Sequence, residues 1–160
     1  LSKCLGGGLR LAYCAAPSSR CGLSLGHAMR STAVMASPIS SALATCWIED
    51  GTADEIIGYI RAESAARQAI ASELLAGLEY RSAPNAFNVW LRLPEGAGRA
   101  DLMGRLTGRH IGIMPSDAFT VLGRPDEHVR VCLGGSISRD ELRRGLLLMT
   151  DSLQPNAWVG

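Results

Sequence analysis

The order of the predicted elements favours an α/β fold, an α+β sandwich in which helices flank a small mixed β-sheet. Three observations carry this prediction. Long helical segments fill most of the first half of the chain, and the second half reads as strand, helix, strand, strand and helix. Hydrophobic residues make up 47% of the 160 residues and charged residues 19%, which is enough apolar surface for a packed core. Helices and strands in this order pack as layers around one core.

Four elements are predicted before the first long loop. Residues 9–16 alternate loosely between apolar and polar and are bounded by glycine and proline, which predicts a strand. Serines before residues 20–32, and a Ser-Pro pair that opens residues 38–49, are typical helix starts. A capping box, Thr-Ala-Asp-Glu, opens the longest helix over residues 52–78. The charged side chains of that helix are expected on a solvated face: Arg61, Glu63, Arg67 and Glu73.

The remaining chain alternates strands with helices. Bulky apolar residues predict a strand over residues 86–93, and a helix follows over 99–107. Two further apolar runs predict strands over residues 110–114 and 129–133. A second capping box, Ser-Arg-Asp-Glu, opens the last helix over residues 138–153. The three tryptophans are expected to pack in the structure rather than to anchor an interface: Trp47, Trp90 and Trp158.

Composition argues against several classes of function. A net charge of +1 and 5% aromatic residues indicate neither a basic surface nor a base-stacking surface for nucleic acid within this segment. No apolar run reaches the roughly 20 residues of a membrane helix. The histidines lie far apart, and the cysteines are odd in number without a Cys-x-x-Cys pair, so we expect no metal site and no disulfide framework. Buried free thiols in a reducing cytosol are the expectation for the cysteines: Cys4, Cys14, Cys21, Cys46 and Cys132.

Lys3 is the only lysine among the sixteen Lys and Arg residues of the chain. A lysine amine can be deprotonated to act as a nucleophile toward a carbonyl group, whereas a guanidinium stays protonated. Lys3 precedes a run of three glycines and stands seven positions before Arg10, whose planar fork suits a phosphate group. Composition alone also permits an ordinary exposed lysine. The surrounding motif favours a covalent carbonyl site beside a phosphate site.

The segment Ser-Lys-Cys-Leu-Gly-Gly-Gly-Leu-Arg-Leu-Ala, residues 2–12, resembles the cofactor-lysine motif of fold-type I pyridoxal 5'-phosphate (PLP) enzymes, the class I and II aminotransferases. The resemblance implies that Lys3 forms the Schiff base with PLP and that Ser2 and Arg10 hold the phosphate. It departs from the family pattern at four positions, where Thr, Ala, Pro and Gly are replaced by Cys4, Gly6, Gly7 and Ala12. None of the four carries an assigned chemical role.

Arg130 lies between two valines on a predicted strand. A buried arginine is costly unless it is paired, so the residue belongs to an ion pair, to an exposed sheet edge or to a binding site. The resemblance implies the last of these, because a matching strand arginine in aminotransferases binds the substrate α-carboxylate. A bidentate guanidinium fits a planar carboxylate. The loop over residues 114–119 matches a family loop near the active site, but we assign it no chemistry, because Pro, Ser and Asp also form simple turns.

Three later segments look most like one branch of the family, the MocR-type regulators of the GntR family. These segments are Val-Trp-Leu-Arg-Leu-Pro (89–94), Met-Pro-Ser-Asp-Ala-Phe (114–119) and Arg-Val-Cys-Leu-Gly-Gly (130–135) followed by Ser-Arg-Asp-Glu-Leu. The branch joins a DNA-binding winged helix to an aminotransferase-like domain that senses PLP. The resemblance therefore implies a cytoplasmic homodimer that binds an amino-acid-like effector and contacts DNA only through an N-terminal domain before Leu1.

The resemblance also divides the chain into three parts. Residues 1–36 correspond to the end of a large domain with the cofactor lysine, residues 37–80 to linking helices, and residues 81–160 to the C-terminal small domain of a fold-type I aminotransferase. Three functions stay open: the effector domain of a regulator, part of a catalytic aminotransferase, or a structural domain without a ligand. Family residues that hold the PLP ring precede the lysine, so this chain alone is expected to bind PLP weakly or not at all, with Lys3 and Arg10 poorly ordered or displaced.

Overall fold

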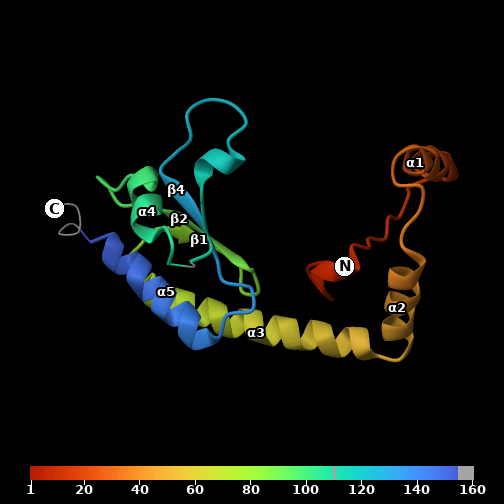
Figure 1. The fold of residues 1–160 in the computed structure, drawn as a ribbon, viewed down its shortest axis with the longest axis horizontal. Helices are drawn as coiled ribbons and strands as arrows, with labels where there is room; N and C mark the ends of the chain where they lie inside the picture. The colour runs from red at the N-terminus through yellow and green to blue at the C-terminus, as the bar shows by residue number, and fades with distance from the viewer. Residues whose placement is uncertain (110, 155–160) are drawn as a thin grey trace. The chain divides into compact units, whose positions relative to one another are not determined.

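The computed structural model describes residues 1–109 and 111–154 of the chain. It confirms the α/β class, with a four-stranded sheet and helices packed on it (Figure 1). The chain divides into two compact units, Leu1–Ile60 and Arg61–Gly160. The long helix α3 (Thr52–Leu74) begins in the first unit and ends in the second.

The first unit contains a short 3-10 turn, η1 (Gly7–Leu9), and two helices, α1 (Ser19–Thr32) and α2 (Pro38–Glu49). Both helices begin where the sequence predicts. The Ser18 hydroxyl accepts a hydrogen bond from the backbone of α1, and the Ser37 hydroxyl accepts one from α2, with proline at the first turn of α2. A small apolar cluster packs the N-terminal segment against α2: Leu9, Leu11 and Ala44, with Leu1, Leu5 and Trp47 against them.

The strand predicted over residues 9–16 is wrong. Leu9 closes the 3-10 turn, Arg10 takes a left-handed conformation with φ 47°, and no strand is present up to Pro17. Leu9 and Leu11 are buried against Ala44, which explains the alternation of apolar residues without a sheet. A strand needs hydrogen-bonding partners on a neighbouring strand, and alternation alone does not supply them.

Helix α3 differs from its prediction at both ends. Thr52 is the first helical residue rather than the cap, and its amide donates to the Asp50 carboxylate at 2.9 Å. The helix ends at Leu74 instead of continuing to residue 78, because the chain turns through Gly77 with φ 85°. Gly51 also has a positive φ of 86°, which lets the chain reverse between α2 and α3.

The second unit carries the sheet, built from β1 (Tyr80–Arg81), β2 (Asn88–Arg92), β3 (Ile113–Pro115) and β4 (His128–Cys132). Its strand order is β1-β2-β4-β3. Every described pairing is antiparallel, whereas the sequence predicts a mixed sheet. The helix between β2 and β3 does make these two strands run in the same direction, but β4 inserts between them and pairs with both.

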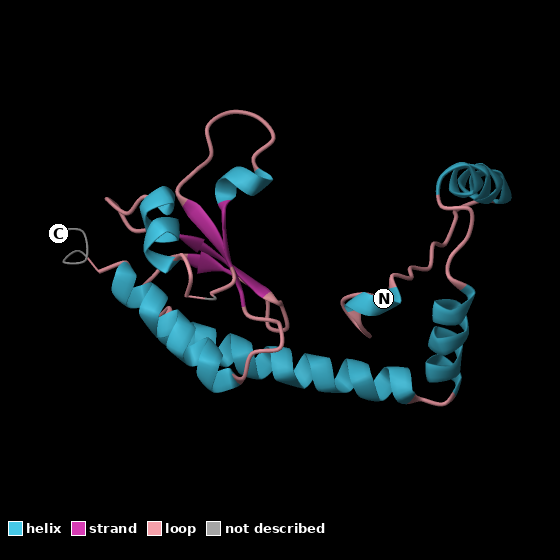
Figure 2. Ribbon diagram, viewed as in Figure 1, coloured by secondary structure: helices cyan, strands magenta, loops and turns pink. Residues whose placement is uncertain are grey.

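The helices of the second unit cover one face of this sheet (Figure 2). They are the end of α3, α4 (Arg99–Leu106) and α5 (Arg139–Ser152). Alternate strand residues point into the core that the helices cover: Val89, Leu91, Val129 and Val131. They pack against Leu75, just after α3, and against Leu102 of α4 and Leu146 of α5, each 0% exposed. The residues between them face the other side of the sheet and are less buried.

Other boundaries differ by a few residues. β1, a two-residue strand, is not predicted from the sequence. The strand predicted over residues 110–114 ends before Pro115, which is part of β3. His110, the first residue of that predicted strand, lies outside the described residues, as does Trp158. The capping box at Ser138 is present with both of its hydrogen bonds. Trp47 packs in the first unit, and Trp90 packs against other rings.

The expectation of buried thiols is wrong. Three of the five free cysteines are exposed, at Cys14, Cys21 and Cys46, and the other two are partly buried. No group of three or more His, Cys, Asp or Glu residues is arranged to hold a metal ion in the part of the chain that the structure describes. Likewise, no helix within residues 1–109 and 111–154 is long and apolar enough to cross a membrane.

Candidate functional site

The lysine segment forms a turn at the start of the first unit. Residues 2–5 turn, with the Leu5 amide donating to the Leu1 carbonyl at 2.9 Å, and η1 follows. The Lys3 and Arg10 side chains are exposed, and Ser2 is partly buried. The positive φ of Arg10 ends the 3-10 turn and interrupts what would otherwise be extended chain.

The glycines of this segment leave open space around the backbone. A Cβ atom added at Gly6, Gly7 or Gly8 would meet no other atom within 4 Å. The segment therefore offers an amine, a hydroxyl and a guanidinium beside a backbone that a ligand can approach closely. This donor set fits PLP, which has an aldehyde for the amine and a phosphate for the other groups.

Arg130 lies in the second unit, at the middle of β4. It pairs in register with Trp90 of β2 on one side and with Met114 of β3 on the other. Strand β4 is therefore central in the sheet, and the edge position that the sequence left open is excluded. The Arg130 side chain lies on the face opposite the helices, because its neighbours Val129 and Val131 fill the core.

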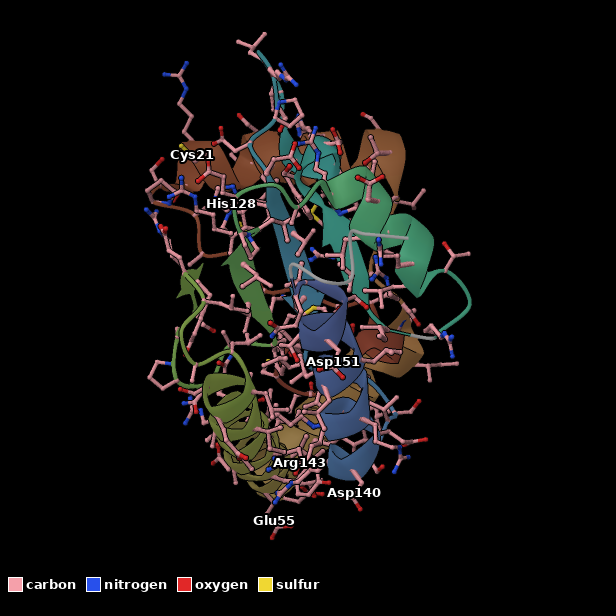
Figure 3. The ribbon with its side chains drawn as sticks, turned by 90° about the vertical axis from the view of Figure 1, so that its left-hand side faces the viewer. Cys21, Glu55, His128, Asp140, Arg143 and Asp151 are labelled. Carbon is pink, nitrogen blue, oxygen red and sulfur yellow. The ribbon has the colours of Figure 1, made fainter. Side chains whose placement is uncertain are left out.

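The Arg130 guanidinium contacts an aromatic ring. Its Cζ lies 4.9 Å from the ring centroid of Phe119. Its Nε is buried and has no hydrogen-bond partner among the described residues. Trp90 contacts the edge of Phe119 at 5.5 Å and stacks on His128 at 5.7 Å; His128, which begins β4, is labelled in Figure 3. Arg130 therefore lies on the same face of the sheet as the Trp90 and His128 rings, with the Phe119 ring against its guanidinium.

Arg130 differs from the other partly buried arginines of the described chain. Four arginines are not fully exposed: Arg67, Arg99, Arg130 and Arg143. Arg67 pairs with Glu63 at 2.7 Å, Arg99 with Asp117 at 2.8 Å, and Arg143, labelled in Figure 3, with Glu73 at 2.8 Å. Within residues 1–109 and 111–154 no carboxylate pairs with Arg130. The ion pair that the sequence left open for Arg130 is therefore not formed there.

Phe119 ends a second 3-10 turn, η2 (Ser116–Phe119). Arg99, at the start of α4, fixes this turn with two hydrogen bonds to the Asp117 carboxylate, at 2.8 and 3.0 Å. Arg99 also donates to Glu127 at 2.7 Å and to the carbonyls of Pro125 and Asp126. These hydrogen bonds lower the pKa of Asp117 and raise that of Arg99. The turn and the start of β4 are thereby tied to one helix end.

Sequence reasoning missed Phe119, Trp90 and Arg99 as parts of this arrangement. One signal for Arg99 was available, since a cation in the first turn of a helix is opposed by the helix dipole and so needs partners elsewhere. The contact between Phe119 and Arg130 left no signal, because it depends on how the loop folds over the sheet. Among the predicted residues, Ser2, Lys3 and Arg10 lie in the first unit and Arg130 in the second.

The fold is similar to that of known aminotransferases, although no protein-family model and no curated protein sequence matches the chain. The multiple substrate aminotransferase from Thermococcus profundus matches with a TM-score of 0.83 and 23% identity, over 95% of this chain and 38% of that one. LysN, the α-aminoadipate aminotransferase from Thermus thermophilus, matches with 0.79 and 18% identity, over 95% and 40%. An archaeal alanine:glyoxylate aminotransferase matches with 0.78 and 19% identity, over 95% and 38%.

The chain thus spans about two fifths of the length of these three structures. The LysN structure holds N-(5'-phosphopyridoxyl)-L-leucine, and a matching Pyrococcus horikoshii kynurenine aminotransferase is in complex with PMP. Identities of 18–23% establish the fold and leave function to the residues. The chain has the fold of the C-terminal part of a fold-type I aminotransferase.

Proposed function

We propose that this chain is the C-terminal part of a PLP-dependent aminotransferase, which moves an amino group between an amino acid and a 2-oxo acid. The observation that carries the proposal is Arg130, a partly buried arginine with an unsatisfied Nε on a central strand of an aminotransferase fold. We favour the enzyme over a MocR-type regulator because the matched structures are aminotransferases. On the same reading, residues 1–36 end a large domain, 37–80 link, and 81–160 form the small domain.

In this proposal Arg130 binds the α-carboxylate of the amino acid. A guanidinium that is partly removed from water needs an acceptor, and a carboxylate accepts two parallel hydrogen bonds from it. The surroundings support an external acceptor, because the other partly buried arginines already pair with Asp or Glu side chains. Arg130 would thus fix the orientation of the bound amino acid.

The lysine segment of the first unit has a proposed role of its own. Lys3 would be the residue that holds PLP covalently and the base that takes the α-proton. Ser2 and Arg10 hold the phosphate, helped by backbone amides of the glycines. When bound, PLP withdraws electron density from the amino-acid Cα. The chain's own contributions are then attachment, phosphate binding, carboxylate binding and the movement of one proton.

The experiment that tests this function follows the α-proton. The protein encoded by the reading frame that contains this chain is incubated with PLP and single L-amino acids in D2O, without a 2-oxo acid, and loss of the Cα–H signal is followed by NMR. We expect exchange of the α-proton, abolished by Lys3→Ala and slowed at least tenfold by Arg130→Gln. Arg92→Gln is the matched control, because Arg92 is an exposed arginine on the neighbouring strand.

Three outcomes separate the candidate functions. Exchange that depends on Lys3 supports the enzyme, and transfer to 2-oxoglutarate then completes the case. Binding of the amino acid without exchange indicates a sensor, and the upstream reading frame would then be expected to encode a winged helix. Absence of binding to both PLP and amino acids indicates a structural domain. Size-exclusion chromatography of the same samples tests the proposed homodimer.

A further inference from the structure

The Arg130 guanidinium contacts an aromatic ring, whereas the guanidinium groups of Arg67, Arg99 and Arg143 contact carboxylates. Phe119 reaches the guanidinium from a different element, the turn between β3 and β4, with 4.9 Å between Cζ and the ring centroid. Phe119 is itself 44% exposed, which is unusual for a large apolar side chain that only fills a core. Phe119 contacts both the Arg130 guanidinium and the Trp90 ring.

We propose that Phe119 is a positioning residue, which holds the Arg130 guanidinium in the orientation that receives a carboxylate. The inference rests on the proposed function, in which Arg130 binds that carboxylate. A cation is attracted to the face of an aromatic ring, and the attraction grows as water is excluded. The Arg130 Cζ lies over the face of the Phe119 ring, and the N–H groups that bind a carboxylate lie at the edge of the guanidinium plane.

The ring is held in place from two directions. Trp90 contacts it edge-on with an interplanar angle of 78°, a favourable arrangement for two aromatic rings. The turn that carries Phe119 is tied down by the paired hydrogen bonds between Arg99 and Asp117. The Ser116 hydroxyl donates to the Asp126 carbonyl at 2.5 Å and closes the same loop. Phe119 therefore starts from a fixed position before any ligand binds.

Preorganisation is the physical gain. An unrestrained arginine side chain loses rotamer freedom when it binds a carboxylate, and a ring that already restrains it removes part of that cost. The strength of a contact of this kind depends on how much water is excluded from it. Phe119 is partly exposed, so an intermediate effect is expected, about a fivefold change in carboxylate affinity.

The test uses the 160-residue chain and acetate as the probe carboxylate. NMR gives two readouts. The first is the rate at which the Arg130 Nε–H exchanges with water, with the signal assigned by its loss in Arg130→Gln. The second is the acetate concentration that shifts the backbone amide signals of β2 and β4, which are present in every variant, Arg130→Gln included. We expect Phe119→Leu to speed exchange about tenfold and to weaken acetate binding about fivefold, because the buried Nε loses its cover.

Two further variants separate positioning from general packing. Phe119→Tyr keeps the ring and is expected to restore both readouts. Phe87→Leu makes the same change at the other phenylalanine of the chain and is expected to leave the Arg130 signal unchanged. Amide spectra of β2 and β4 show whether each variant keeps its fold.

Each result decides a different question. If Phe119→Leu folds and changes neither exchange nor acetate affinity, while Arg130→Gln abolishes the acetate response, positioning by Phe119 is overturned and the carboxylate role stands. If the acetate response persists in Arg130→Gln, the carboxylate role fails, and positioning fails with it. If Phe119→Tyr behaves like Phe119→Leu, the ring face does not hold the guanidinium, which also overturns the inference.

Discussion

Replacing Arg67 by alanine tests the strongest polar contact in the core of the second unit. The Arg67 side chain lies on α3 and is 11% exposed. Its guanidinium donates to the Leu133 carbonyl at 2.8 Å and to the Ile137 carbonyl at 2.6 Å, and its Nε donates to Glu63 at 2.7 Å. It therefore ties α3 to the segment between β4 and α5.

The expected loss of stability follows from what the substitution leaves behind. The Leu133 carbonyl is buried, so it loses its donor without access to water, at a cost of about 1–3 kcal/mol. The Ile137 carbonyl is only partly buried, so water replaces part of its lost hydrogen bond. Glu63 keeps Arg139 as a partner at 2.6 Å and is not left as an unpaired charge. Together these terms give a loss of about 3 kcal/mol in the free energy of unfolding of the second unit.

The assay is urea unfolding followed by NMR signals of β2 and β4 amides, which report on the second unit alone. Arg92→Ala is the matched control, since Arg92 also pairs with a glutamate at 2.8 Å, but both side chains are at least 60% exposed. An exposed pair of this kind contributes less than about 1 kcal/mol. The reasoning is refuted if Arg67→Ala and Arg92→Ala lower the unfolding free energy by the same amount with unchanged denaturant slopes.

Two further predictions concern pH and helix α4. Hydrogen bonds from Arg139 and Arg67 lower the pKa of Glu63 from 4.5 to about 2. Its contribution to stability is therefore complete above the pKa of the unfolded chain, 4.5, and is lost as the pH falls from about 4.5 toward 2. Glu63→Gln should make stability depend less on pH in this window, and an unchanged acid unfolding curve would show that other carboxyls dominate. Gly108 lies in the turn just after α4 and has a φ of 77°, so Gly108→Ala should destabilise the second unit by about 1 kcal/mol. Gly104 lies inside α4 with open space around it, so Gly104→Ala should stabilise the second unit by about 0.5–1 kcal/mol. Thermal unfolding of both variants checks the opposite signs.

Local signals in the sequence predicted most of the helices. Caps at Ser18, Ser37 and Ser138 place three helix starts within a residue, because a cap is a contact between residues three positions apart. The strand over residues 9–16 failed because pairing in a sheet is decided by a distant partner. The antiparallel sheet was missed for the same reason, since β4 inserts between β2 and β3 only in three dimensions.

In the candidate site, too, residues marked by their local sequence could be predicted, and partners brought in by tertiary structure could not. The lysine motif is visible in the sequence because its residues lie within nine positions of one another and one of them is chemically unusual for this chain. Arg130 is visible because a strand pattern surrounds it. Its ring partner is not visible, since Phe119 belongs to a turn of common turn-forming residues whose tertiary position depends on Arg99.

Arg67 and Arg130 show why sequence can estimate the cost of a buried arginine without assigning its role. Arg67 is expected on the solvated face of its helix, but it is buried, and its acceptor at Leu133 lies 66 residues away. Arg130 lies between two valines in the sequence, and its buried Nε meets no acceptor among the described residues. Both arginines must offset the same loss of hydration. The acceptors around each guanidinium identify Arg67 as a structural residue and support Arg130 as a residue whose acceptor comes from a ligand.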